Sequence, residues 1–227
     1  MTKPAAPRYS PQALAFLRSL KRNNRREWFV PRKGVYDTQV RQPTLDIVAR
    51  LADDLRMVAP EIVADQKSAV YRIYRDVRFS ANKAPYKTHV AASFPTRGLA
   101  KHQGAGLYFH VSPDEVWIGG GVYAPPPQAL VAIREHIAGN TRRLRAIVES
   151  PAFRRTFGAL EGARLQRVPR GFRADHAGAE YLKFKQIFAG RELPGSAATR
   201  SDFYQTLLTT FRQVLPLVRF LNEPLMD

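Results

Sequence analysis

The sequence predicts an α+β fold: a mainly antiparallel sheet with amphipathic helices from both ends of the chain packed on its apolar face. Three observations predict it. Apolar residues recur with a helical period near both termini, they alternate with polar residues in the middle of the chain, and the strand segments there follow one another through hairpin turns without intervening helices. With 44% hydrophobic residues, a chain of 227 residues can bury a substantial core.

The first sixty residues are predicted to be helical. Ser10 is a favourable N-cap and Pro11 suits the first position of a helix, so a helix is expected over residues 11–22. A second amphipathic pattern begins after Pro43 and stops at Pro60. These helices are the N-terminal ones expected to pack on the apolar face of the sheet.

The apolar period then changes to two, which predicts entry into a sheet. Residues 69–79 form the first predicted strand, with one mostly apolar and one mostly polar face, and residues 89–94 form a shorter one. Residues 106–123 are predicted to form a hairpin around a proline-containing turn. In that register three side chains share one face of the sheet: Tyr108, His110 and Trp117.

Helices return after three consecutive prolines at residues 125–127. The first is predicted to end at Gly139, and Asn140 and Ser150 can each begin a further short helix. Residues 163–176 are predicted to be irregular.

The end of the chain is predicted to add a strand and a long helix. Asp175 can cap a short helix that runs to about Lys185, and residues 186–193 form a strand. Residues 200–222 carry a clear apolar stripe and form the final helix, which contains Pro216.

For the domain organisation, we expect residues 1–10 to be disordered or loosely ordered and residues 11–227 to form a single compact α+β domain. Residues 195–199 form one short linker. No apolar run reaches the roughly 20 residues that span a bilayer, and the first residues lack a hydrophobic signal core. We therefore expect a cytoplasmic protein without membrane contact. The absence of cysteine excludes disulfides, zinc ribbons, iron–sulfur clusters and thiol catalysis.

The charge predicts anionic partners. Lysine and arginine total 36 against 19 acidic residues, which leaves +17. The excess is spread along the folded body, with local concentrations in residues 67–89 and 142–173. Arginine-rich composition also follows from GC-rich codons, so charge alone does not assign a function. Helix-turn-helix, RRM and zinc-finger signatures are missing, so sequence-specific DNA recognition is disfavoured, while non-specific contact with nucleic acid stays open.

Several blocks resemble a known family. The run RIYRDVRFS at residues 72–80 is followed by PYKTH at residues 85–89, and further matching blocks are EWF at residues 27–29, GGGVY at 119–123 and FLN at 220–222. These blocks closely resemble the bacterial and fungal family called domain of unknown function 2461, over nearly the whole chain. The resemblance implies a single compact α+β domain. That family has no assigned activity, so the resemblance implies no catalytic residue.

The polar face of the predicted strand at residues 69–79 is the first candidate site. Side chains two residues apart on a strand lie about 7 Å from each other on the same face, so Arg72 and Arg78 can clamp an anion there, with Tyr74 as a hydroxyl donor and Asp76 orienting a guanidinium. A structural ion pair between Asp76 and Arg78 explains the pattern equally well. With the following loop, the predicted ligand-binding residues are Arg72, Tyr74, Arg75, Arg78, Lys83, Lys87 and His89.

The glycines at residues 119–121 lack the pattern of a phosphate-binding loop. Glycines within a strand indicate a bulge or a close approach of another group. Packing of Trp28 or Trp117 over them is the structural interpretation, and a hollow beside Tyr108 and His110 is the functional one.

Catalysis stays an open alternative. Asp76, His89 and His110 are the candidate acid–base residues of a hydrolase or transferase acting on a phosphorylated or anionic substrate. The pair Asp175 and His176 is explained by helix capping. Histidine spacings give no metal site, and we expect no cofactor. A third alternative is a non-catalytic interaction protein. The expected partner is an anionic small molecule or a nucleic acid, and the oligomeric state is left open.

Overall fold

The computed structural model describes residues 6–99 and 103–226. At its centre lies a four-stranded antiparallel sheet in which each strand pairs with the next along the chain. The strands are β1 (Val90–Pro95), β2 (Gly106–Val111), β3 (Glu115–Val122) and β4 (Ile187–Pro194). The predicted α+β class is confirmed, as are the strand at residues 89–94, the hairpin and the strand at residues 186–193.

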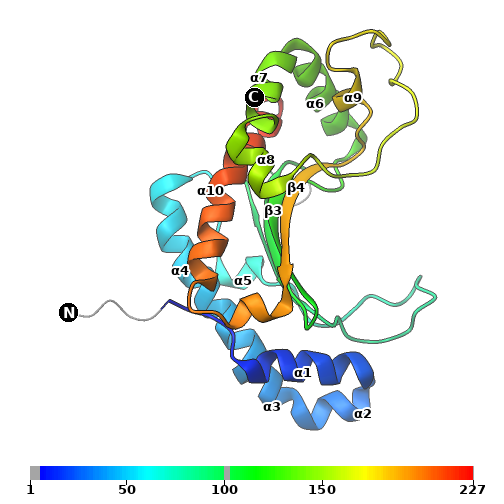
Figure 1. The fold of residues 1–227 in the computed structure, drawn as a ribbon. Coiled ribbons are helices and arrows are strands. Elements are labelled where there is room, and N and C mark those ends of the chain that lie inside the picture. The colour runs from blue at the N-terminus through cyan, green and yellow to red at the C-terminus, as the bar shows by residue number, and fades with distance from the viewer. Residues whose placement is uncertain (1–5, 100–102, 227) are drawn as a thin grey trace.

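Helix α10 (Phe203–Asn222) packs directly on one face of the sheet, and α4 (Gln42–Val58) lies on the same side (Figure 1). Gly120 permits this close packing, because a Cβ there would meet Val214 and Val218 of α10 at 3.0 Å. Helices from both ends of the chain therefore bury the apolar face, as predicted, and leave the opposite face open to solvent.

The N-terminal helical region begins with α1 (Pro11–Arg22), whose N-cap Ser10 accepts a hydrogen bond from the backbone N–H of Ala13. The short segments that follow pack at one end of the sheet. They are α2 (Arg26–Phe29), η1 (Val30–Arg32), α3 (Lys33–Tyr36) and η2 (Asp37–Arg41), and after α4 comes α5 (Gln66–Ala69).

Residues 1–5 of the N-terminal segment predicted to be loose lie outside the described residues. Within the same segment Tyr9 is buried, and its hydroxyl shares a hydrogen bond of 2.8 Å with Thr44 Oγ1. The ordered part of the chain thus begins before Pro11.

The helices after the sheet gather at its other end (Figure 1). They are α6 (Pro127–Gly139), α7 (Thr141–Val148), α8 (Pro151–Phe157) and α9 (Ala179–Leu182), and near the end of the chain η3 (Gly195–Thr199) and η4 (Glu223–Leu225). Within residues 6–99 and 103–226, no helix combines the length and apolarity needed to cross a bilayer.

Two predictions in this half of the chain are wrong. Asp175 does not cap a helix, because it forms an ion pair with Arg173 at 2.7 Å and α9 begins only at Ala179. Residues 195–199 are not a linker, since they form the 3₁₀ turn η3 with Ala198 fully buried.

The strand predicted over residues 69–79 is also wrong. After Tyr71, whose N–H donates to the Ala91 carbonyl, the chain leaves the sheet and projects as a loop that returns at residues 85–87. Isolated bridges are all that remains of the pairing, at Val70 with Ala92 and at Tyr74 with Tyr86. The alternation of apolar and polar residues predicted a buried strand face that included Phe79. The Phe79 side chain is 96% exposed, so it does not mark a buried sheet face.

Candidate ligand site

The open face of the sheet carries a hollow of about 560 Å³. Its described lining includes six aromatic residues, two histidines, one serine and one lysine. The lining residues with polar, charged or aromatic side chains are Tyr71, Lys87, His89, Ser93, Phe94, Tyr108, His110, Trp117, Tyr123 and Phe188.

The strand register brings these side chains together. His110 lies opposite Trp117, Tyr108 opposite Gly119, and Phe188 opposite Gly121. Directly paired residues project from the same face of a sheet. The predicted common face of Tyr108, His110 and Trp117 is therefore confirmed.

Glycines shape the floor. A Cβ at Gly119 would meet the indole of Trp117 at 2.7 Å, and a Cβ at Gly190 would collide with the same ring. The indole therefore lies flat against the backbone of β3 and β4. The packing interpretation holds for Trp117, while Trp28 instead packs on Phe16 at a centroid distance of 5.6 Å. The flattened indole is at the same time part of the floor of the hollow.

Five rings form a continuous series of contacts, which we call the aromatic row. Tyr71 contacts Tyr108 with ring centroids 6.4 Å apart, and Tyr108 contacts Trp117 at 5.8 Å. Trp117 contacts Phe188 at 6.0 Å, and Phe188 contacts Tyr123 at 5.7 Å. The row thus crosses the sheet from the edge beside β1 to Phe188 on β4 and returns to Tyr123 after β3. Neighbouring ring planes are inclined to each other by 44° to 69°.

Two histidines adjoin the row. The rings of His89 and His110 have centroids 5.3 Å apart, and His110 Nε2 lies 2.9 Å from Glu115 Oε1. Burial lowers the pKa of His89 to about 4, with further contributions from His110 and Lys87. His89 is therefore neutral at pH 7.

Other polar groups complete the hollow. Burial, followed by Tyr71, raises the pKa of the Tyr108 hydroxyl, so the phenol stays protonated. Ser93 Oγ is buried without a hydrogen-bond partner among the described residues. Lys87 is the one lysine or arginine among the described lining residues, and its Nζ lies 3.0 Å from the Arg72 carbonyl oxygen and 4.9 Å from the Tyr71 ring centroid.

Of the residues predicted from sequence, the structure brings Lys87, His89 and His110 into this hollow. The predicted clamp on one strand face is not formed, because the strand does not exist. Arg78 instead pairs with Asp76 at 2.7 Å, and the hydrogen bonds from Arg78 lower the pKa of that carboxyl group.

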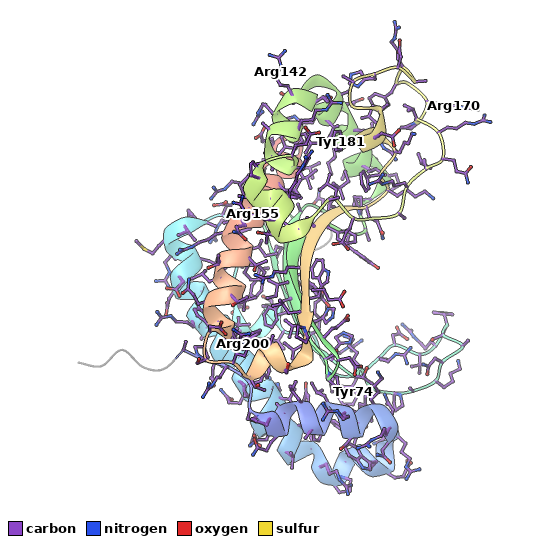
Figure 2. The ribbon with its side chains drawn as sticks, viewed as in Figure 1. Tyr74, Arg142, Arg155, Arg170, Tyr181 and Arg200 are labelled. Atoms are coloured by element: carbon purple, nitrogen blue, oxygen red, sulfur yellow. The ribbon has the colours of Figure 1, made fainter. Side chains whose placement is uncertain are left out.

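The remaining predicted residues have local roles in the projecting loop. Arg75 Nη1 donates to the Ala84 carbonyl at 3.1 Å, and Lys83 Nζ donates to the Val77 carbonyl at 3.1 Å. Tyr74 packs against Tyr86 with ring centroids 5.5 Å apart, and Figure 2 shows it at the base of the loop. Arg72 is exposed beside Lys87.

Five residues in or beside the hollow were not predicted from the sequence as site residues: Tyr71, Ser93, Glu115, Tyr123 and Phe188. Alternation within the predicted strand at residues 186–193 was a signal for Phe188. Tyr71 gave no such signal, because its position depends on an isolated bridge beside β1.

Comparison with protein-family models matches residues 12–220 to a model described as "Conserved hypothetical protein (DUF2461)". Comparison with curated proteins and with solved structures gave no match.

Proposed function

The chain belongs to the DUF2461 family of conserved hypothetical proteins, and for this member we propose that the hollow on the open sheet face binds a ligand that carries both a flat ring and an anionic group. The observation that carries the proposal is the combination, in one hollow, of the aromatic row with Lys87 at its end. Pockets of this kind, mostly apolar with a few placed polar groups, are typical of ligand sites.

The ring part of the ligand is supported by the contacts of the floor. Flat aromatic groups pack on Tyr and Trp rings with ring centroids 4.5–7 Å apart, and the aromatic row offers several such surfaces side by side. Ser93 Oγ lacks a partner among the described residues and can donate a hydrogen bond to a ligand.

The anionic part is supported by charge. Lys87 reaches the hollow, Arg72 is exposed beside it, and the chain as a whole carries +17. Among the lining residues that the structure describes there is no aspartate or glutamate. A phosphate or carboxylate group therefore finds a favourable position at the Lys87 end.

Tryptophan fluorescence tests this proposal. The chain has two tryptophans, so Trp28→Phe leaves Trp117 as the single reporter in the hollow. We expect adenosine monophosphate to quench its emission, adenosine to do so more weakly, and inorganic phosphate not at all. Equal effects of adenosine and its monophosphate would remove the anionic part of the proposal, and no effect of either would remove all of it.

A second candidate function is acid–base catalysis on the bound anion. It is favoured by His110, whose imidazole is held by the Glu115 carboxylate, and by the neutral His89 beside it. Asp76, the third predicted acid–base residue, pairs with Arg78 and is not among the described lining residues.

The catalytic candidate is tested by incubating a short RNA with the protein in the presence of a metal chelator. Turnover that is lost in both His89→Ala and His110→Ala supports it. No turnover by the unchanged protein under these conditions contradicts it.

A further inference from the structure

The aromatic row is longer than one ligand ring requires. It has five members, and each successive pair of centroids is between 5.7 and 6.4 Å apart. A mononucleotide has one base and occupies one or two of these positions. A row that crosses the strands instead suits a ligand with several flat groups in succession.

The Tyr71 end of the aromatic row lies next to basic residues, Lys87 and the exposed Arg72. On the β4 side, residues 161–165 pair along residues 183–188, and there the Arg164 guanidinium lies over the Phe184 ring, 4.1 Å from its centroid. Figure 2 shows Arg170 reaching outward from the loop that follows this segment. Cations at one end of a series of rings suit a ligand that combines flat groups with anionic groups.

The acidic residues near the row restrict where anions can lie. Glu161 bridges to Phe188, and Glu192 lies opposite Trp117 across β3 and β4. Glu115 is hydrogen bonded to His110. The middle and the β4 side of the row therefore favour uncharged rings, and anionic groups are favoured at the Tyr71 end, beside Lys87 and Arg72.

We infer that the ligand of the hollow is a single-stranded nucleic acid, laid across the sheet with successive bases on the aromatic row and with phosphate groups toward Lys87 and Arg72 at the Tyr71 end. This inference rests on the proposed function, and it names the class of ligand. Aromatic side chains stack on any base, and positively charged surroundings follow the backbone, so binding of this kind tolerates many sequences. A duplex does not fit, because its bases are already stacked inside the helix.

The experiment uses the Trp28→Phe protein and measures both Trp117 quenching and the anisotropy of labelled oligonucleotides. The probes are oligouridylates and oligothymidylates of two, five and ten nucleotides, a ten-base-pair duplex, and adenosine monophosphate. We expect affinity to rise from two to ten nucleotides, the decamer to quench Trp117, the duplex to bind more weakly, and affinity to fall as salt rises.

Variants of the aromatic row separate stacking from charge attraction. Tyr123 is 66% exposed, so its replacement does not endanger folding. We expect Tyr123→Ala to weaken decamer binding about five- to hundred-fold, the range found for loss of one base-stacking side chain, whereas Tyr123→Phe keeps the ring and retains affinity.

Charge variants provide the matched comparison. Arg72→Ala removes an exposed cation at the Tyr71 end, and Arg155→Ala removes one from α8, on the helical side of the sheet (Figure 2). We expect the first to weaken decamer binding and the second to leave it nearly unchanged. Equal losses in both variants, without quenching of Trp117, would mean non-specific attraction to the charged surface and would overturn the inference.

Two further outcomes separate this inference from the proposed function. If adenosine monophosphate quenches Trp117 but affinity does not rise with oligonucleotide length, the inference is wrong and the proposed function stands. If neither mononucleotide nor oligonucleotide quenches Trp117, both are wrong. A preference between the uridylate and thymidylate series identifies RNA or DNA as the better ligand.

Discussion

The indole of Trp117 lies flat on Gly190 of the neighbouring strand, where a Cβ atom would collide with three atoms of the ring. Gly119 completes this seat on the same strand as the tryptophan, two residues further on. The two glycines thus set the depth of the hollow, because a tilted indole would stand up into the space that a ligand is proposed to occupy.

Gly190→Ala tests this relationship. The added methyl group must displace Trp117, and such overpacking costs about 1–3 kcal/mol. We expect the free energy of unfolding in urea to fall by that amount and the emission of Trp117, measured with Trp28→Phe, to shift. Gly34→Ala is the control, since no atom beyond its chain neighbours and the backbone of its own helix lies within 4 Å of a Cβ built there. An unchanged stability of Gly190→Ala would contradict the packing described for the floor.

Asn222 supports a second prediction. Its side-chain amide donates to Thr96 Oγ1 at 2.8 Å and to the Ala105 carbonyl at 2.9 Å, and its Oδ1 accepts from the Ala105 N–H at 2.7 Å. The side chain thereby ties the end of α10 to the segments that follow β1 and precede β2. The structure gives this asparagine, part of the FLN block at residues 220–222, a structural role.

We expect Asn222→Ala to lower the free energy of unfolding by about 2–4 kcal/mol, because it removes three buried hydrogen bonds and leaves the Ala105 N–H without its partner, while Thr96 Oγ1 still donates to the Ala105 carbonyl. Urea unfolding followed by circular dichroism measures the change. Gln205→Ala, which removes an exposed hydrogen bond to Thr209 on the same helix, is expected to cost under about 0.5 kcal/mol. Similar losses in the two variants would refute the role of the buried amide.

Much of the fold was predictable because its signals are local. The apolar stripe of the last helix, the proline turn of the hairpin and the alternation in β2 each depend on residues near in sequence. The same alternation placed Tyr108, His110 and Trp117 on one face, which is the centre of the hollow.

The errors occur where long-range contacts override a local pattern. Alternation in residues 69–79 matched a strand, but Ile73 and Arg75 bond to the returning arm of their own loop and not to a neighbouring strand. Arg72 and Arg78 therefore do not share one face of a strand, and Arg78 forms an ion pair with Asp76. Tyr71 became part of the aromatic row through its backbone bond to Ala91, a pairing between segments that no sequence pattern marks.

His89 gives a prediction about pH. Its pKa in the folded protein is lowered to about 4 from an ordinary value of 6.5. The unfolded chain therefore binds a proton more readily, so folding stability is lost as pH falls from about 6.5 towards 4. We expect a loss on the order of 2 kcal/mol from this group after allowance for its partial exposure.

Urea unfolding at pH 4.5 and pH 7 measures the effect, and His89→Gln removes the titrating group. The difference in stability between the two pH values is expected to be smaller in the variant. Proton NMR of the unchanged protein provides an independent check through the titration of the His89 ring. Titration of that ring near 6.5 would show that burial does not suppress its charge.

Lys87 and Lys83 both belong to the basic loop, but of the two only Lys87 is among the described residues that line the hollow. Comparing their variants therefore tests whether the anion binds beside Lys87. Lys83 Nζ instead donates to the Val77 carbonyl in the projecting loop. A charge-assisted hydrogen bond contributes about 1.5–3 kcal/mol, so we expect Lys87→Met to weaken binding of adenosine monophosphate by about ten-fold or more. Lys83→Met removes the same charge and is expected to change affinity by less than about two-fold. Fluorescence titration of Trp117 measures both variants. If they lose affinity equally, the anion is attracted by the charge of the whole loop and does not occupy a defined position beside Lys87.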